Sequence, residues 1–229
     1  MISKHRIIFA ALALLAGSWG CALPHGSYAR PVKPMADGTT AISVGALVPI
    51  AAAAGATTDS DSVSAAGIAD NFTLVPAAAF DYAFGTGKYF GLELSLLKAF
   101  EDVTGTFGFF ANPRFELPLN GDGDDRTLTF LIDGNFGYFG SDAASTPFFA
   151  PTVGIRYYVP MGDMGLILTQ NLGTGFITFA FPGSVAFDLA LGKFHIFPEV
   201  RWDPTVAVTS EGSGGWVFLS GGLSFMLEL

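Results

Sequence analysis

His195 and Glu199 stand four residues apart in a stretch that alternates apolar and polar residues, so both side chains are expected on one face of a strand. An imidazole near a carboxylate can act as a general base when a serine lies within hydrogen-bond reach, and Ser184 is the nearest candidate in the sequence. The chemistry would then be hydrolysis. The alternative is a hydrogen-bonded network without a catalytic role. We favour the network and expect no enzyme.

Two acidic stretches carry oxygen atoms that could bind a cation. The stretch NGDGDD, residues 120–125, resembles the start of a calcium-binding loop, with its oxygens on Asn120, Asp122 and Asp124. It lacks the glycine at the sixth position and the glutamate at the twelfth, so we interpret it as a polar turn. The acidic residues at 59–61 are expected in a solvated loop. Two of the three histidines lie within the first 25 residues, and no metal or cofactor is expected.

Cys21 is the sole cysteine, so the chain has no disulfide framework. It follows a basic start and a short apolar stretch, residues 7–17, which together are typical of a secretory signal peptide. The stretch LLAGSWGC resembles the lipobox of bacterial lipoproteins, which implies a diacylated Cys21. Cleavage after Ala29 is the alternative. We therefore divide the chain into a signal peptide (1–20), a linker after the lipidated cysteine (21–38) and one folded domain (39–229).

The composition excludes several classes of protein. Of 229 residues, 50% are hydrophobic but only 14% are charged, against about 25% in an average soluble domain. The net charge of -9 and the absence of a basic stripe argue against a nucleic-acid partner. No stretch of about 20 apolar residues is present, so the sequence offers no ordinary membrane helix.

Beyond residue 39 the sequence alternates with the period of a β-strand. We predict about ten antiparallel strands, at residues 40–50, 71–84, 88–98, 104–117, 126–139, 148–159, 165–172, 183–191, 194–205 and 216–229. Short turns such as 85–87 alternate with longer loops, for which the candidates are 51–70, 141–147 and 173–182. Many of these strands reach the roughly nine to eleven residues that cross a bilayer when tilted. Alternating short turns and long loops are typical of outer-membrane barrels.

Every strand has one greasy face and one face of small and polar residues. The polar face carries Asp81, Glu93, Arg114, Glu116, Asp133, Arg156, Asp188, His195, Glu199, Arg201 and Asp203. A solvated surface usually holds more charge than this, and the interior of about ten strands has no room for so many phenylalanines. We therefore predict that the polar face lines a narrow interior, in which arginines and carboxylates pair, and that the apolar face contacts lipid.

The apolar face carries two further features. Aromatic residues near strand ends predict girdles at the two membrane interfaces, formed by Phe84, Tyr89, Tyr138, Phe148, Tyr157, Trp202 and Trp216. Prolines recur at positions 76, 113, 151 and 198. Because a proline removes a hydrogen bond from the ladder, we expect a β-bulge at each of them.

From Thr39 to Leu229 the chain resembles small bacterial outer-membrane β-barrels of the OmpA and OmpW type. The last residues, GLSFMLEL, have the alternation of a final barrel strand, although such barrels usually end on an aromatic residue and this chain ends on Leu229. The resemblance implies an all-β, up-and-down transmembrane barrel in the bacterial outer membrane. It also implies contact with outer-membrane lipid, assembly by the barrel-assembly machinery and a monomeric state.

The function expected of such a barrel is structural, or binding of ligands and partners through its extracellular loops, with a largely plugged interior. Three alternatives remain open. The barrel could be a narrow channel for small or hydrophobic solutes. It could instead be a lipid-modifying enzyme, or a soluble carrier similar to the lipocalins, with the greasy face turned inward.

Overall fold

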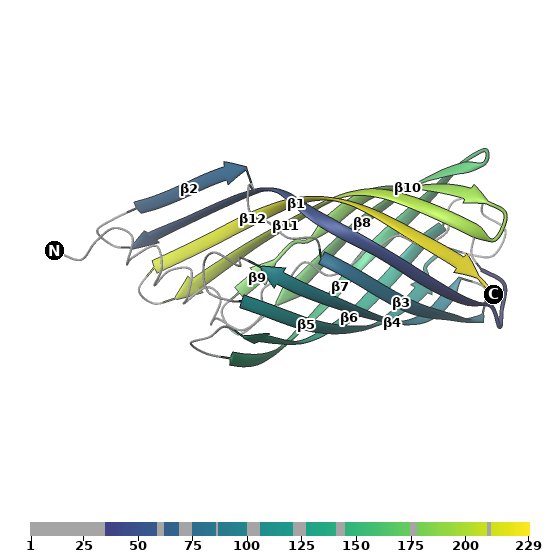
Figure 1. The fold of residues 1–229 in the computed structure, drawn as a ribbon, viewed down its shortest axis with the longest axis horizontal. Coiled ribbons are helices and arrows are strands. Elements are labelled where there is room, and N and C mark those ends of the chain that lie inside the picture. The colour runs from purple at the N-terminus through teal and green to yellow at the C-terminus, as the bar shows by residue number, and fades with distance from the viewer. Residues whose placement is uncertain are drawn as a thin grey trace.

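The computed structural model describes residues 35–58, 62–68, 75–85, 87–99, 106–120, 127–140, 145–174, 178–209 and 212–229. Apart from short turns and connections, these residues form twelve β-strands in one sheet (Figure 1). The strands are β1 (Thr40–Thr58), β2 (Ser62–Ile68), β3 (Val75–Gly85), β4 (Lys88–Ala99), β5 (Thr106–Pro118), β6 (Thr127–Gly140), β7 (Ser145–Met161), β8 (Met164–Thr174), β9 (Thr178–Ala180), β10 (Gly183–Leu191), β11 (Phe194–Thr209) and β12 (Gly212–Glu228). No helix in the described part of the chain is long and apolar enough to span a membrane.

The sheet closes into an antiparallel barrel of ten strand positions. Neighbouring strands pair in sequence order, and the barrel closes where β1 pairs with β12, from Ala41 opposite Glu228 to Thr58 opposite Gly212. Two positions hold a broken strand. The short β9 and β10 both pair with β8 and with β11, and β2 and β3 both pair along the same edge of β1. The ten predicted strands are therefore all present, which confirms the predicted fold class.

The expected long loops are partly wrong. The loop predicted at 51–70 is mostly strand, because β1 continues to Thr58 and β2 pairs back onto it. In the same way β7 already begins at Ser145, while β8 and β9 occupy five of the seven described residues of the loop predicted at 173–182. Small residues such as those of AAAAGATT lack the alternation that marks a strand, yet their backbone groups still pair with the neighbouring strands.

The two ends of the barrel differ. Gly87, Gly162 and Gly192 each have a φ near +70°, in the left-handed region, and form the tight turns after β3, β7 and β10. These turns and the C-terminus lie at one end, which is the periplasmic end in outer-membrane barrels (Figure 1). At the same end, Asn120 Oδ1 accepts a hydrogen bond of 2.8 Å from the backbone N–H of Leu128 and so shapes the turn after β5. Asp122, Asp124 and residues 59–61 lie outside the described residues.

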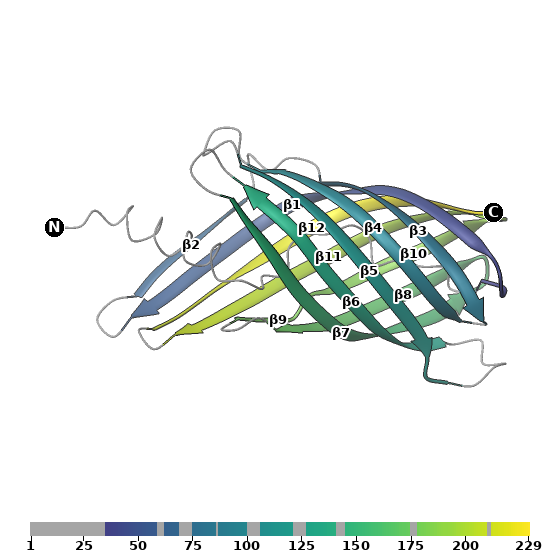
Figure 2. The same cartoon turned by 90° about the horizontal axis from the view of Figure 1, so that it is seen from below.

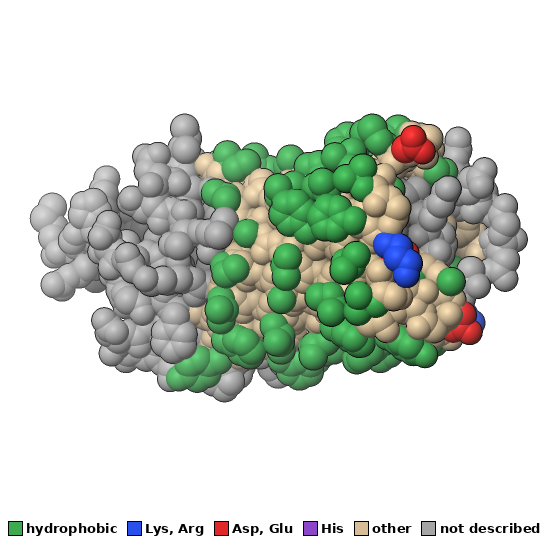
Figure 3. All heavy atoms as spheres, turned by 45° about the vertical axis from the view of Figure 1, so that its right-hand side comes forward, with side chains coloured by type: hydrophobic (Ala, Val, Ile, Leu, Met, Phe, Trp, Pro, Cys, Tyr) green, Lys and Arg blue, Asp and Glu red, His purple; other side chains and the backbone are tan. Residues whose placement is uncertain are grey.

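Side chains alternate between a greasy exterior and a polar interior. Phe80, Phe109 and Phe136 point outward and are 45, 44 and 48% exposed. Figure 3 shows apolar side chains over one flank, with the charged side chains on that flank near the end that carries the tight turns. Large apolar side chains left facing outward around a closed barrel mark a lipid-contacting surface. The alternative of a soluble, lipocalin-like carrier with a greasy interior is therefore wrong.

Two details of the apolar face need correction. Tyr89 was expected in an aromatic girdle, but it is 3% exposed and points inward, as its alternation with Glu93 requires. The expected bulges at the four prolines are also absent from the described strands. The register runs through each proline unchanged, and the register shifts lie instead at Pro49–Ala51 and at Ala83–Gly85. A proline removes one ladder bond without inserting a residue, so pairing resumes in register. The side chains of Phe148 and Trp216 lie outside the described ones.

Candidate functional site: the polar interior

All eleven polar side chains that the alternation assigned to the inner face lie inside the barrel. Their exposed fractions run from 0% for Asp81 to 6% for His195. The full set is Asp81, Glu93, Arg114, Glu116, Asp133, Arg156, Asp188, His195, Glu199, Arg201 and Asp203. Seven of them are carboxylates and three are arginines, so these described side chains carry more negative than positive charge. Buried charges of this kind are stable only when they are paired and hydrogen-bonded.

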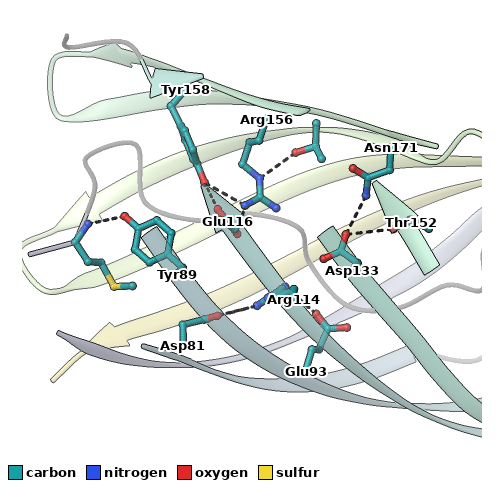
Figure 4. A network of polar contacts seen from close by, with 12 residues as sticks. Asp81, Tyr89, Glu93, Arg114, Glu116, Asp133, Thr152, Arg156, Tyr158 and Asn171 are labelled. Atoms are coloured by element: carbon teal, nitrogen blue, oxygen red, sulfur yellow. Dashed lines mark hydrogen bonds and ion pairs between the residues drawn. The ribbon is translucent and has the colours of Figure 1, made fainter. Parts of the chain in front are cut away.

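Arg114 on β5 is the centre of the first cluster (Figure 4). Its Nη2 lies 3.4 Å from Asp81 Oδ1 on β3, and its Nη1 lies 3.4 Å from Glu93 Oε2 on β4. The side chain of Asn112 donates a further hydrogen bond of 3.3 Å to Glu93 Oε1. One guanidinium therefore joins three adjacent strands and places one positive charge between two buried carboxylates.

Gly91 makes this contact possible. It lies on β4 directly between Asp81 and Arg114, because the register pairs it with both of them. A Cβ atom at this position would overlap the Asp81 Oδ1 atom and press on the Arg114 side chain. Only glycine leaves the space through which the arginine reaches across one strand to the aspartate.

Arg156 on β7 is the centre of the second cluster. Its Nη1 atom pairs with Glu116 Oε1 and also lies 3.2 Å from the Tyr158 hydroxyl, while its Nε donates a hydrogen bond of 3.3 Å to Thr169 Oγ1. Tyr158 in turn donates a hydrogen bond of 3.4 Å to Glu116 Oε2. The arginine is 1% exposed, and this set of partners links β5, β7 and β8.

Asp133 on β6 forms a third cluster with neutral partners. Thr152 donates a hydrogen bond of 3.3 Å to Asp133 Oδ2, and the side-chain amide of Asn171 donates another of 3.3 Å to the same atom. Asp133 also stands directly opposite Arg114 in the β5–β6 register, so the first and third clusters are neighbours along the wall of the barrel. Figure 4 shows the three clusters together.

The remaining charged side chains lie on β10 to β12. Arg201 Nη2 is 2.6 Å from Asp203 Oδ1, and both residues have no exposed surface. Nearer the periplasmic end, His195 Nδ1 donates a hydrogen bond of 2.8 Å to Asp188 Oδ1, and its Nε2 lies 3.6 Å from Glu228 Oε1.

The catalytic alternative finds no support in this sector. The register pairs Ser184 with Arg201 and pairs His195 with Ala190. Six residues of strand separate His195 from the position opposite Ser184, which corresponds to about 20 Å at 3.4 Å per residue. The serine therefore lies far outside the hydrogen-bond reach that a nucleophile and its base require. Within the described part of the chain, no group of three or more His, Cys, Asp or Glu side chains is placed to hold a metal.

The sequence reasoning missed several residues of the interior. Thr169 and Asn171 on β8 both occupy inward positions, so their polarity and position could have identified them. Met35 could not be found in this way, because it belongs to the segment expected to be a linker. It is 2% exposed, and its backbone N–H donates a hydrogen bond of 2.7 Å to the hydroxyl of the inward-facing Tyr89.

Met35 belongs to a compact apolar cluster inside the barrel near the end that carries the tight turns. The cluster consists of Met35, Ala41, Ala83, Tyr89, Tyr158, Ile167, Ala186, Phe197 and Met226. Several members stand beside the periplasmic turns in the register. The end of the expected linker is thus folded into the periplasmic mouth of the barrel.

No protein-family model and no curated protein matches the chain. Among solved structures, the chain is similar to the outer membrane protease OmpT from Escherichia coli, with a TM-score of 0.55 and 9% identity over 87% of this chain and 99% of that chain. It also aligns with the translocator domain of the autotransporter NalP from Neisseria meningitidis, with a TM-score of 0.37 and 9% identity over 98% of this chain and 96% of that chain. The fold is that of a bacterial outer-membrane β-barrel, which confirms the predicted location. The narrower likeness to OmpA and OmpW stays a prediction.

Proposed function

We propose that this protein is a closed outer-membrane barrel with a structural or recognition role at its extracellular end, rather than a channel. The observation that carries the proposal is the filled interior. The inward charges are at most 6% exposed, and Arg114 and Arg156 each bind carboxylates on other strands. A barrel of this size has little lumen to spare once its side chains are in place.

The periplasmic mouth supports the same proposal. Met35 lies within the apolar cluster and is held by the Tyr89 hydroxyl, while the backbone N–H of Gly38 donates a hydrogen bond of 2.8 Å to Ala83 O. These contacts hold residues 35–38 inside the periplasmic mouth, against β3 and β4, before the chain enters β1. A solute would have to displace this segment in order to pass.

The opposite end offers the surface for recognition. There β1, β2, β11 and β12 project beyond the other strands (Figure 2). Pairing between β1 and β12 continues to Thr58 opposite Gly212, and pairing between β11 and β12 continues to Thr209 opposite Gly212. A rigid, paired extension can present its tip to a ligand or partner outside the membrane at low cost in conformational entropy.

Conductance in planar lipid bilayers tests this proposal. The refolded wild-type barrel is expected to give no steady single-channel steps. The proposal depends on the filled interior. A variant that replaces both Arg114 and Arg156 with alanine should therefore be measured beside the wild type, because it removes the central arginine from each of two clusters. Steady steps from the wild type would refute the closed barrel and support the narrow channel. Its surplus of carboxylates would then favour cations over anions in a reversal-potential measurement.

The expectation that the chain is not an enzyme needs its own test. The similar structure OmpT is a protease, but at 9% identity the likeness carries the fold and nothing of the activity. Incubation of the refolded barrel with a mixed peptide library, followed by mass spectrometry, checks for proteolysis. An unchanged lipid profile on deletion of the gene would count against a lipid-modifying activity.

Lipidation of Cys21 is a further part of the proposal. Cys21 lies fourteen positions before Met35, which is fixed at the periplasmic mouth, and the chain between them spans at most about 50 Å when extended. A lipid on Cys21 can thus reach the inner leaflet beside the barrel. We further propose assembly by the barrel-assembly machinery and a monomeric state, which cross-linking in intact cells can test.

A further inference from the structure

Glu199 on β11 is an interior carboxylate that has no counter-charge among the described residues. It is 4% exposed, and neither of its carboxylate oxygens has a hydrogen-bond partner within the described chain. Directly across the neighbouring strands it faces Ala186 on β10 and Gly222 on β12, which have no polar side chain. An isolated buried carboxylate is costly, so this position calls for a positive or hydrogen-bonding occupant.

The nearest arginine does not supply that charge. Arg201 stands two residues along the same face, but its Nε and Nη2 atoms lie 2.9 and 2.6 Å from Asp203 Oδ1. The guanidinium is therefore directed along the strand toward Asp203, away from Glu199. With Arg201 matched by Asp203, this group of three residues keeps one uncompensated negative charge, that of Glu199.

Two further oxygen atoms flank the carboxylate. Ser184 and Ser220 both stand opposite Arg201 in the register, so each is a diagonal neighbour of Glu199 at about 7–8 Å between Cα atoms. Their exposed fractions are 1 and 0%, and neither hydroxyl has a partner in the described chain. Oxygen atoms of this kind, carboxylate and hydroxyl together, are the ligands that hard cations prefer.

A small cavity lies beside Phe197, two residues before Glu199 on β11 and nearer the periplasmic end of the barrel. A cavity of about 10 Å³ is lined by residues that include Phe197, Ser224 and Glu93, and Phe197 precedes Glu199 on the inward face of β11. This volume corresponds to about one water molecule. The cavity is not lined by Glu199, Ser184 or Ser220, so the proposed site rests on the oxygen atoms of these three side chains themselves.

We propose that Glu199, Ser184 and Ser220 form an interior binding site for one small monovalent cation of the sodium class. The single uncompensated negative charge of Glu199 favours a cation with one positive charge. The surrounding carboxylate and hydroxyl oxygen atoms favour a hard cation. This inference goes beyond the proposed function, because a closed barrel needs no bound ion. Failure of the site would leave the silence in planar bilayers unaffected.

The thermal midpoint of the refolded barrel tests the site. Measurements at constant chloride concentration compare sodium with choline, which is too large for an enclosed site. Because a ligand that binds only the folded state raises its stability, the wild-type midpoint is expected to rise and then saturate as sodium replaces choline. The isosteric variant Glu199→Gln is expected to lose this rise. The matched control Asp133→Asn keeps it, because Asp133 is a buried carboxylate that is bound by Thr152 and Asn171 on other strands.

A second measurement covers the case in which Glu199→Gln fails to fold. The double variant Ser184→Ala with Ser220→Ala keeps the charge and removes two ligands, and it is expected to need several-fold more sodium for the same rise. A wild-type midpoint that is the same in sodium and in choline would overturn the proposal. An equal sodium response in Glu199→Gln would overturn it as well.

Discussion

Replacing Arg114 with alanine is expected to destabilise the barrel by about 3–5 kcal/mol, the usual cost of removing one partner of a buried ion pair. The structure explains why the cost lies in this range. Arg114 is 4% exposed and stands 3.4 Å from both Asp81 and Glu93, which are themselves 0 and 2% exposed. The variant therefore removes the Arg114 cation from two buried carboxylates. Urea unfolding of the refolded protein, followed by tryptophan fluorescence and by gel mobility of unboiled samples, measures the change in the free energy of unfolding.

Two variants separate charge from packing in this prediction. The triple variant Arg114→Ala, Asp81→Asn, Glu93→Gln removes the uncompensated charges and is expected to recover most of the lost stability. Lys88→Ala changes an exposed cation at a turn and should stay within about 0.5 kcal/mol of the wild type. The reasoning fails if Arg114→Ala lies within about 1 kcal/mol of the wild type, or if the triple variant is no more stable than the single one.

Three further predictions concern the interior, the exterior and the mouth. Gly91→Ala should cost about 1–3 kcal/mol in urea unfolding, since the new methyl group displaces the Asp81 carboxylate; a cost near zero would show that Arg114 does not depend on this gap. Phe80→Arg places a cation on the lipid face and should cost about 2–4 kcal/mol in vesicles, whereas a neutral result would argue against lipid contact there. Tyr89→Phe removes the acceptor for the Met35 N–H, so it should lower the free energy of unfolding by about 1 kcal/mol and speed hydrogen exchange of that amide. Unchanged exchange would contradict the closure of the mouth.

The period of two residues explains why so much of this fold could be predicted. This period places Phe80 and Phe115 on the outer face and their neighbours Asp81 and Arg114 on the inner face. In a closed barrel the outer face contacts lipid and the inner face contacts the polar interior. The error at Tyr89 arose where residue type was given more weight than this period. Alternation places Tyr89 with Glu93 on the inner face, whereas its aromatic ring suggested a girdle.

The partners of the interior charges could not be predicted from the sequence. Arg114 meets Asp81 because the registers of β3 with β4 and of β4 with β5 both place Gly91 between them. Alternation fixes the face of each residue but leaves the register between strands open by steps of two. Met35 was missed for a different reason. It lies outside any strand, and only the tertiary contact with Tyr89 gives it a place.

The pairing of β1 with β12 has a consequence for how the chain acquires its shape. The barrel closes only when β1 pairs with β12, which brings Ala41 opposite Glu228. This is the longest pairing that β1 makes. Contacts so remote in sequence form slowly. Until the last strand arrives, the first strand presents a bare edge to other chains, and such edges promote aggregation. A chain truncated within β12 should therefore accumulate as aggregate rather than as a smaller barrel.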